Sequence, residues 1–394
     1  MKLSNSIFRF AGMVIAALCI AVGMHMLYPH PDPHHLMLIG IGLTTNTFVY
    51  DTNLLMQIVP NLKRAQKFLL DKFYPNIITS DTEYVSIDVD VGKRRMSPFV
   101  SPLVEGKLVE QRRIQTNIFK PAYIKDKRAP DIRKPVRRMI GERIGGDLTA
   151  QEREMANIEF EMTDQVDMID RRLEWMAAQA LLSGTVTISG EGFQTVVVDF
   201  GRASDLTVAL SGGLKWTQAN IGTDAAPGTV SPVANIDTWA TLILKESGGV
   251  ATDIVFTTSA WQAFLLDPKL KRANWYPNQG GDNRVELGTQ VQRGAMSKGR
   301  WGNYNLWLYN DWYVDDNNVE QPMLPDGSIV MSGPDLLGTR AFASILDPAF
   351  NYSAMPYAPK TWVENDPAQR FIMMQSSPIV IPSRVNAAFS AQVL

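Results

Sequence analysis

The side chains that most often carry nucleophilic or metal chemistry are confined to one short stretch of this chain. The four histidines are His25, His30, His34 and His35, and Cys19 is the only cysteine among 394 residues. A Ser-His-Asp or Cys-His site elsewhere in the chain therefore lacks its parts. Prolines interrupt the histidine cluster, so we expect a solvated linker rather than a preorganised metal site. A single cysteine also excludes an intrachain disulfide framework and favours a reducing compartment.

Two further motifs could bind a cation or a cofactor, and both are weak. Residues 84–91 alternate as a half-buried strand does, which places Asp88 and Asp90 on one face. That spacing can hold a divalent cation, but a solvent-facing strand edge produces the same pattern far more often. Gly40 and Gly42 begin like a dinucleotide-binding loop, yet the third glycine and a preceding strand are missing. We therefore predict no catalytic, cofactor-binding or metal-binding residues. An enzyme that uses a pair of carboxylates stays open as an alternative, ranked behind the two that follow below.

Aromatic and basic residues offer a second kind of chemistry, stacking on nucleic-acid bases. Trp301 follows Lys298 and Arg300, a pattern that could stack on bases. Nine tryptophans spread along the chain are more typical of core and interface anchors. The formal net charge of −2 also argues against a dedicated nucleic-acid binder. These residues therefore favour interfaces over active sites.

The N-terminal segment has two interpretations. Lys2 and Arg9 precede an uncharged, mostly apolar run over residues 10–27, as in a signal peptide or a short membrane anchor. Alternatively, translation begins at Met37, and residues 1–36 are a spurious extension. The first interpretation favours a secreted or membrane-anchored binding protein.

Residues 92–143 form a basic block, with fifteen Lys and Arg against five Asp and Glu. Its prolines exclude a long helix, and its β-branched and aromatic residues favour strands. We predict an extended, two-stranded basic arm. Its own hydrophobic face is too thin to fold alone, because an isolated hairpin is marginal in water. Another surface must therefore cover the arm.

An acidic amphipathic helix is predicted after the basic block. Residues 147–174 hold nine Asp and Glu against three Arg, and apolar residues recur every three or four positions from Met155 to Ala180. The spacing predicts one long helix over residues 147–182, with Thr149 and Glu152 as a capping box and Gly184 just beyond its end. A β-hairpin is predicted over residues 185–200.

The reversal of charge between these two blocks suggests what covers the arm. The arm could contact phosphates, form a solvated loop, or lie on the acidic helix of a neighbouring subunit, and the reversal favours the neighbour. Pairing within one chain is the simpler alternative. Surface ion pairs contribute only ~0–1 kcal/mol each, so apolar residues should supply affinity and charges should set register. The predicted subunit-interface residues are Phe99, Val100, Leu103, Arg112, Arg113, Phe119, Tyr123, Glu159, Asp167, Trp362 and Arg370.

The C-terminal segment and several earlier patches resemble one known family. Residues 359–378, PKTWVENDPAQRFIMMQSSP, resemble the closing segment of the bacteriophage lambda-type major capsid (major head) proteins. Residues 99–106, 119–125, 182–184 with 190–193, 198–202 and 322–328 resemble the same family in the same order. The likeness covers most of residues 48–394 and is weakest over 204–238 and 275–297.

This resemblance implies the α+β, HK97-like fold of tailed-phage capsid proteins. Residues 37–91 would hold an N-terminal arm with the first helix and strand, and residues 92–133 the extended loop. Residues 134–234 would form a peripheral domain around the long helix, and residues 235–344 an axial domain. Strands in residues 345–394 would rejoin the peripheral domain.

The resemblance also implies a function and partners. The family's subunits form hexamers and pentamers of an icosahedral shell around double-stranded DNA, assembled in the host cytoplasm and carried in the virion. A decoration protein, a scaffold and a portal are further implied partners, and no cofactor is implied. An encapsulin-like compartment, which uses the same fold, remains an alternative beside the secreted or membrane-anchored binding protein.

Overall fold

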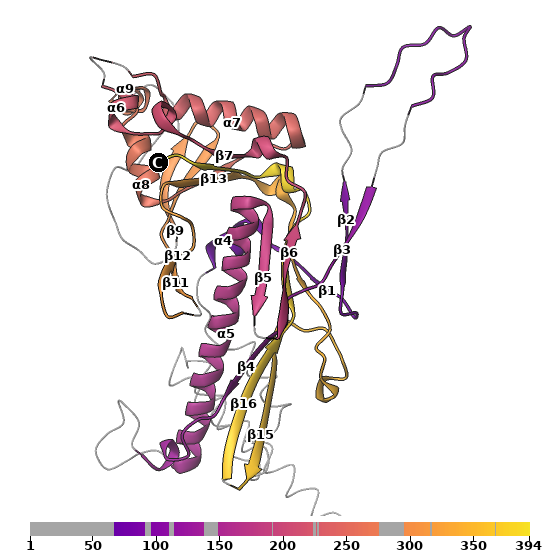
Figure 1. Cartoon of the computed structure of the whole chain (residues 1–394), viewed down its shortest axis with the longest axis vertical. Helices are drawn as coiled ribbons and strands as arrows, with labels where there is room; N and C mark the ends of the chain where they lie inside the picture. Colours follow the sequence, from indigo (N-terminus) through magenta and orange to yellow (C-terminus); the bar gives the residue numbers. More distant parts are fainter. Residues whose placement is uncertain are drawn as a thin grey trace, which may run out of the picture. The chain divides into compact units, whose positions relative to one another are not determined.

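The computed structural model describes residues 67–90, 96–109, 114–137, 149–190, 192–223, 226, 228–275, 295–315, 317–366 and 368–394 (Figure 1). Helices and strands are mixed along the chain, as the predicted α+β class requires. The α-helices are α4 (Phe68–Phe73), α5 (Ala150–Ser183), α6 (Gln218–Ile221), α7 (Pro232–Ser247), α8 (Thr258–Leu265) and α9 (Pro268–Trp275). The apolar leader, the histidine cluster and the glycine motif at Gly40 lie outside the described residues.

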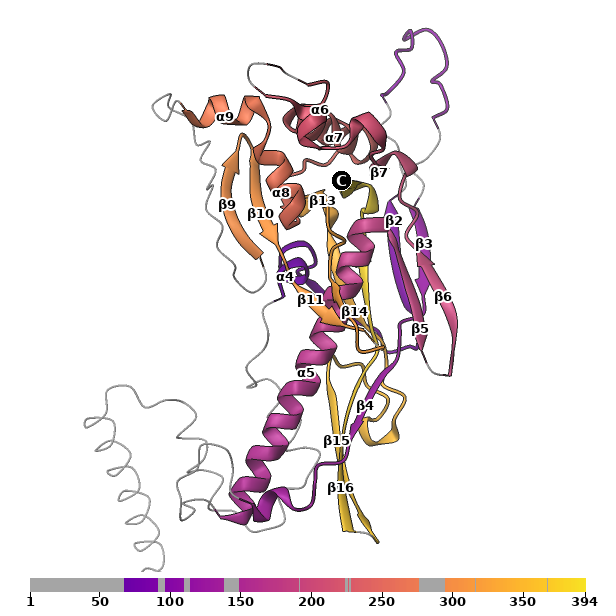
Figure 2. The same ribbon diagram turned by 60° about the vertical axis from the view of Figure 1, so that its left-hand side comes forward.

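A six-stranded sheet separates two hydrophobic clusters. Figure 2 shows the backbone of this sheet. Its strands in spatial order are β7 (Thr207–Ala209), β18 (Phe389–Gln392), β13 (Ser328–Ser332), β8 (Asp253–Phe256), β10 (Tyr304–Tyr309) and β9 (Ala295–Trp301). Ile254 and Phe256 of β8 belong to the cluster with α7 and α8, whereas Val255 belongs to the cluster around α5. Successive side chains of a strand point to opposite faces, so a strand buried on both faces is apolar throughout.

Tryptophans are anchors of the cluster that contains α7 and α8. The Trp239 ring of α7 stacks against Trp216 and Phe389, with ring centroids 5.7 and 4.9 Å away. Trp261 of α8 packs against Phe256 and Phe264 at 5.5 and 5.7 Å. The prediction that tryptophans act as packing anchors is confirmed for these three residues, which are at most 5% exposed.

The long acidic helix is confirmed as α5, which has 34 residues and begins and ends close to its predicted limits. The Thr149 hydroxyl accepts from the Glu152 amide at 3.2 Å, and the Glu152 carboxylate accepts from the Thr149 amide at 2.7 Å. This is the predicted capping box. Gly184 follows the last turn with φ of 71°, a left-handed conformation that glycine adopts without a Cβ clash. The predicted hairpin follows as β5 (Thr185–Gly190) and β6 (Phe193–Asp199).

Two three-stranded sheets lie beside α5. One has the order β1 (Asn76–Thr79), β14 (Gly338–Phe342) and β17 (Pro378–Pro382), and the other β15 (Ala358–Asn365), β16 (Ala368–Ser376) and β4 (Ile124–Arg128). Residues 124–128 therefore pair with a C-terminal strand, although the extended loop was expected to continue to residue 133. The last strand, β18, also differs from expectation, because it pairs with β13 and β7 in the six-stranded sheet.

The remaining strands form two ribbons. β2 (Val85–Asp90) pairs antiparallel with β3 (Ile114–Phe119), and β11 (Trp312–Val314) pairs with β12 (Glu320–Pro322). Val85 and Phe119 fix the β2–β3 ribbon to the cluster around α5, and residues 96–109 between the two strands form no strand. Among the described residues, no helix is long and apolar enough to cross a membrane, and no three His, Cys, Asp or Glu side chains gather as metal ligands would.

Candidate assembly surfaces

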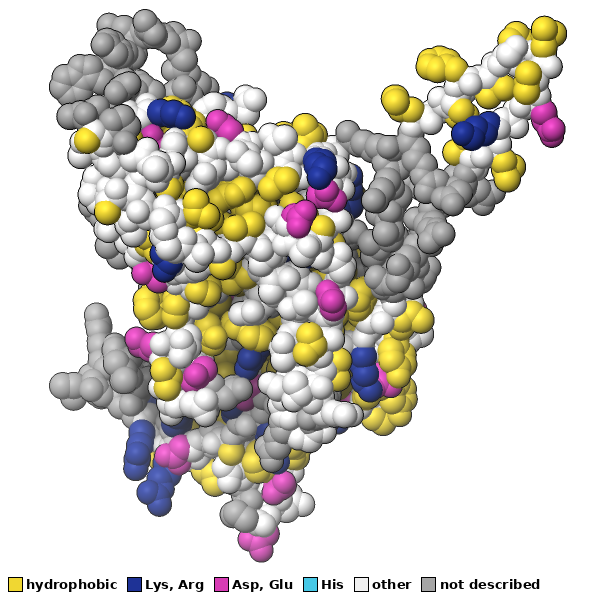
Figure 3. Space-filling view, turned by 45° about the horizontal axis from the view of Figure 1, so that its top comes forward, with side chains coloured by type: hydrophobic (Ala, Val, Ile, Leu, Met, Phe, Trp, Pro, Cys, Tyr) yellow, Lys and Arg dark blue, Asp and Glu magenta, His cyan; other side chains and the backbone are white. Residues whose placement is uncertain are grey.

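Residues 96–109 connect β2 and β3 within the predicted basic arm, and hereafter the arm means this segment alone. It exposes its apolar side chains. Met96, Phe99, Leu103 and Leu108 are each more than 90% exposed, and Val100 is 38% exposed. Figure 3 shows hydrophobic side chains gathered on this segment, with one basic and one acidic side chain among them. An exposed apolar cluster of this kind is typical of a binding surface. Phe99, Val100 and Leu103, three predicted interface residues, are therefore available to a partner.

Phe119 occupies a different environment from the other predicted apolar residues. Its side chain is 7% exposed, and its ring lies 5.4 Å from the ring of Phe200. In the β2–β3 ribbon it lies opposite Val85, which is also buried. The register of the ribbon therefore places Phe119 in the core of its own subunit.

Cations of the basic block beyond the arm pair with the acidic helix of the same chain. Arg128 of β4 contacts Glu161 at 3.0 Å and Asp164 at 2.6 Å, and Lys134 contacts Glu161 at 2.9 Å. Partial burial alone would raise the pKa of Glu161, but the hydrogen bonds from Lys134 and Arg128 outweigh it and lower that pKa. Arg128 and Lys134 thus pair with the acidic helix of their own chain.

Two arginines of the basic block were predicted to reach a neighbouring subunit. Arg112 and Arg113 lie outside the described residues. On α5, Glu159 is exposed and Asp167 is half-buried. A contact between these arginines and a neighbouring α5 stays a prediction.

Three predicted interface residues make contacts within the subunit. The Tyr123 hydroxyl donates to Gln375 Oε1 at 2.7 Å and accepts from the Leu346 amide at 3.1 Å. Partial burial raises the pKa of Tyr123. Arg370 Nε donates to Glu154 at 2.9 Å.

Trp362, the third, belongs to an aromatic pair on the sheet of β15 and β16. Its ring stacks on Phe371 with centroids 5.5 Å apart. The Lys127 ammonium lies 4.0 Å from the Phe371 ring centroid and 5.2 Å from that of Trp362. Trp362 is only half-buried, so part of this cation–π cluster stays accessible.

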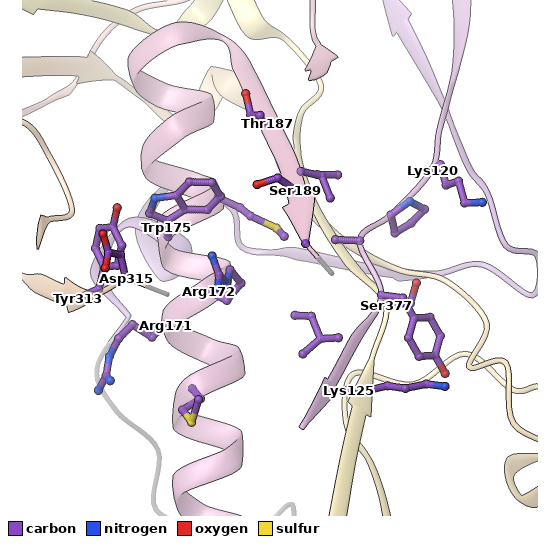
Figure 4. A pocket seen from close by; sticks show the side chains of 18 of the residues that line it. Lys120, Lys125, Arg171, Arg172, Trp175, Thr187, Ser189, Tyr313, Asp315 and Ser377 are labelled. Atoms are coloured by element: carbon purple, nitrogen blue, oxygen red, sulfur yellow. The ribbon is translucent and has the colours of Figure 1, made fainter. Parts of the chain in front are cut away.

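A groove of about 1200 Å³ lies beside α5 (Figure 4). Helix α5 contributes Arg171, Arg172 and Trp175, and β5 contributes Thr187 and Ser189. The residues from β11 and the loop after it are Tyr313, Val314, Asp315 and Asn318. The lining mixes apolar and charged side chains, as a protein-binding groove does.

The β11–β12 hairpin is an exposed surface for which the local sequence carries little signal. Trp312 is 52% exposed, Val314 is 55% exposed and Val319 is 48% exposed. The alternation of Trp312 and Val314 could have indicated one face of a strand, but three residues are too few for that signal to stand out.

The short helix α4 is held at both ends by side chains distant in sequence. The Glu174 carboxylate of α5 accepts from the amides of Leu69 and Leu70 at 2.8 and 3.0 Å and from the Tyr309 hydroxyl at 3.0 Å. Arg340 of β14 donates to the carbonyl of Leu70 at 3.0 Å. Burial raises the pKa of Glu174 to about 7, although these hydrogen bonds oppose the change.

Arg202 holds the C-terminal end of α5 in a similar way. Its guanidinium donates to the carbonyls of Ala180, Leu181 and Leu182 at 3.0, 2.7 and 3.0 Å. These carbonyls lie in the last turn of α5, where only that of Ala180 also accepts a backbone hydrogen bond, from the Gly184 amide at 3.1 Å. A cation at this end also interacts favourably with the helix dipole. Burial lowers the pKa of Arg202 to about 10. The side chain fixes the end of the helix from which β5 continues.

Comparison with known proteins decides what these surfaces belong to. A family model described as phage major capsid protein E matches residues 51–393, which is far more than half of the chain. The chain belongs to the phage major capsid protein E family. The lambda-type resemblance is therefore confirmed, and the match spans both hydrophobic clusters and the arm.

Individual phage capsid proteins also match over most of this chain. The major capsid protein of Escherichia phage lambda is 28% identical over 340 residues, which are 83% of this chain and 96% of that protein. The major capsid protein of Enterobacteria phage phi80 is 27% identical over 354 residues, 88% of this chain and 99% of that protein.

A solved structure shows the same fold. The putative capsid protein of a prophage of Escherichia coli CFT073 superposes with a TM-score of 0.64 at 21% identity, covering 87% of this chain and 99% of that one. The predicted α+β, HK97-like capsid fold is thus confirmed. Among the predicted interface residues of this capsid protein, Phe99, Val100 and Leu103 lie on one exposed segment. Tyr123, Trp362 and Arg370 lie in or next to the sheet formed by β4, β15 and β16.

Proposed function

We propose that this chain is the major subunit of a phage head and that copies of it assemble into a closed icosahedral shell around double-stranded DNA. The observation that carries the proposal is the family match over residues 51–393. The lambda and phi80 relatives, both named major capsid proteins, are covered over 96% and 99% of their lengths. The subunits would form hexamers and pentamers, assembled in the host cytoplasm and carried in the virion.

Apolar burial between copies supplies the driving force in this proposal. Phe99, Leu103 and Leu108 are almost fully exposed in one subunit. Each such side chain contributes roughly 1.5–3 kcal/mol when it is fully buried. A shell repeats the contact in every subunit, so modest individual contacts sum to a stable container.

The proposal contains no chemical step and assigns no catalytic or cofactor-binding residue. Its partners are other copies of the chain, packaged DNA bound without sequence specificity, and a decoration protein, scaffold and portal. The net charge of −2 fits a wall that encloses DNA without binding it tightly.

Electron microscopy of the overexpressed, purified chain tests the proposal. We expect closed shells of uniform size. A product that stays monomeric at high concentration contradicts the proposal. Nuclease-protected double-stranded DNA inside particles from infected cells would distinguish a phage head from a compartment that encloses other cargo.

A further inference from the structure

The guanidinium of Arg202 holds the end of α5 through its two terminal nitrogens. These nitrogens donate to three carbonyls in the last turn of the helix, and one of them also donates to the hydroxyls of Thr207 and Ser390 at 3.3 and 3.4 Å. The third donor of the group, Nε, is buried and has no hydrogen-bond partner among the described residues. Buried donors in native proteins are nearly always paired, because an unpaired one loses its hydration without replacement. Arg202 Nε therefore calls for an acceptor.

The Tyr74 hydroxyl is a second buried polar atom of this kind. Tyr74 is 0% exposed, and within the described ranges its hydroxyl makes no hydrogen bond. Two residues of β14 hold Tyr74 in place. Arg340 Nε donates to its carbonyl at 2.7 Å, and a Cβ at Gly338 would lie 2.5 Å from its ring. The close packing of the ring thus fixes the position of the hydroxyl.

Tyr74 and Arg202 lie close enough to interact electrostatically. Burial raises the pKa of Tyr74, and the Arg202 cation opposes that rise. Burial lowers the pKa of Arg202 to about 10, and Tyr74 opposes that fall. Since neither Nε nor the hydroxyl has a protein partner in the described part of the chain, they are not bonded to each other. One small molecule between them would satisfy both atoms.

The charges near these two atoms favour a neutral molecule. An anion could accept from both donors, but it would lie close to the last carbonyls of α5, at the negative end of the helix dipole. Those carbonyls already face the guanidinium and offset its charge. A cation would be repelled by Arg202. A water molecule can accept from Nε and pair with the hydroxyl, and roughly two to four hydrogen bonds are usual for a buried water.

We propose that one internal water molecule bridges Arg202 Nε and the Tyr74 hydroxyl. The bridge joins the residue that follows α4 to the segment that follows β6, and through Arg202 to the end of α5. It also gives a reason for tyrosine rather than phenylalanine at position 74, within the hydrophobic cluster around α5. This inference concerns the fold of one subunit and goes beyond the proposed shell function.

Tyr74→Phe tests the bridge through the sign of its effect on unfolding. Loss of a bridged hydroxyl removes a hydrogen bond, so the unfolding equilibrium constant of the unassembled subunit should rise about fivefold. Loss of a hydroxyl without a partner removes a buried polar atom, so the constant should stay the same or fall. Urea unfolding measures the constant. The matched control is Tyr352→Phe, because Tyr352 is 55% exposed, and its effect should stay within about twofold. An unchanged or lower constant for Tyr74→Phe overturns the inference.

A crystal structure of the unaltered chain, at a resolution that shows ordered water, locates the molecule without any substitution. The expected result is a single density peak within hydrogen-bond distance of both Arg202 Nε and the Tyr74 hydroxyl. A map without this peak, or a direct bond between the hydroxyl and the guanidinium, overturns the inference. Crystals grown in bromide distinguish an anion, because anomalous scattering at the peak would show bromide there and would also overturn the inference.

Discussion

At the scale of single residues, Glu174 of α5 is an acidic group buried in the subunit. The residue is 2% exposed. Among the described residues its carboxylate accepts three hydrogen bonds, and none of the donors is a cation. Burial of a carboxylate without a cationic partner disfavours the charged form. Glu174 therefore joins α4, α5 and β10 through a group whose proton equilibrium lies near neutral pH.

The stability of the subunit should depend on the protonation of Glu174. Folding raises its pKa from 4.5 to about 7, so between these values the folded state binds more protons than the unfolded state. The free energy of unfolding should therefore fall by about 3 kcal/mol as pH rises from below 4.5 to above 7. Glu174→Gln should remove this dependence. Urea unfolding of the unassembled subunit, followed by circular dichroism from pH 5 to pH 8, measures it.

Glu161→Gln is the matched control for that measurement. The pKa of Glu161 is lowered in the folded state, so its contribution to stability is present at neutral pH and lost as pH falls through the acidic range. The Glu161→Gln variant should keep the slope between pH 5 and pH 8. An unchanged slope in the Glu174→Gln variant would contradict the role of Glu174.

Sequence could predict some residue environments and not others. Phe99 and Phe119 both lie in the basic block, and both were predicted at an interface. They differ because β3 pairs with β2 in a register that places Phe119 opposite Val85 in the core. A one-residue change of register reverses every side chain of a strand, and the local sequence does not show it. Glu174 was missed because its donors Leu69 and Tyr309 are distant along the chain.

At the scale of elements, the end of α5 depends on Gly184. A Cβ at this position would lie 2.7 Å from the Cβ of Arg202, and the backbone φ is 71°. Gly184→Ala should destabilise the subunit by about 2 kcal/mol or more, from left-handed strain and the displaced Arg202 together. Thermal or urea unfolding of the unassembled subunit measures the loss.

Gly213→Ala serves as the control for this element. Nothing lies within 4 Å of a Cβ built on Gly213, and its φ is not in the left-handed region. Its effect on unfolding should stay within about 0.5 kcal/mol. Equal effects of the two substitutions would show that Arg202 and the left-handed turn do not fix the helix end.

The arm and the β2–β3 ribbon should separate assembly from folding. Phe99 and Leu103 contact little in the subunit, so Phe99→Ser with Leu103→Ser should abolish particles while unfolding changes by less than about 0.5 kcal/mol. Phe119→Ser should cost about 3 kcal/mol, because a buried aromatic ring is lost. Particle yield by electron microscopy and urea unfolding measure the two effects. Normal particle yield from the double arm variant would remove the arm from the account.

Elements defined by local signals were predicted well. The capping box, the apolar periodicity and Gly184 defined α5 within a few residues at each end. The positions of β4 and β18 in their sheets were not predicted. β4 pairs with β16 and β18 pairs with β13, more than 50 residues away in each case, and nothing in a short segment specifies such a partner.

At the scale of the whole molecule, the basic block serves two purposes. Arg128 and Lys134 stabilise α5 within one chain, whereas the arginines at 112 and 113 stay the predicted contacts with a neighbour. The groove is formed only where α5, β5 and β11 come together in the fold. The family and its fold could be predicted from sequence patches, whereas the groove and the exposed β11–β12 hairpin could not.

The double charge reversal Arg112→Glu with Arg113→Glu should impair particle formation while the monomer stays folded. Both residues follow the arm in the sequence, and their positive charge is predicted to complement the acidic helix of a neighbour. The control is Lys269→Glu with Lys271→Glu, because these exposed cations lie on α9, outside the basic block. Particle counts and far-ultraviolet circular dichroism measure assembly and folding. Particle yields equal to wild type would contradict this role of charge.

Sedimentation velocity of the purified full chain, over a range of concentrations, tests the central claim most directly. The account predicts a large, uniform species with the mass of a closed shell, in equilibrium with few free subunits. It also predicts that loss of the apolar arm side chains converts this species to folded monomers. A wild-type chain that sediments as a monomer at every concentration, with an intact and exposed arm, would contradict the account.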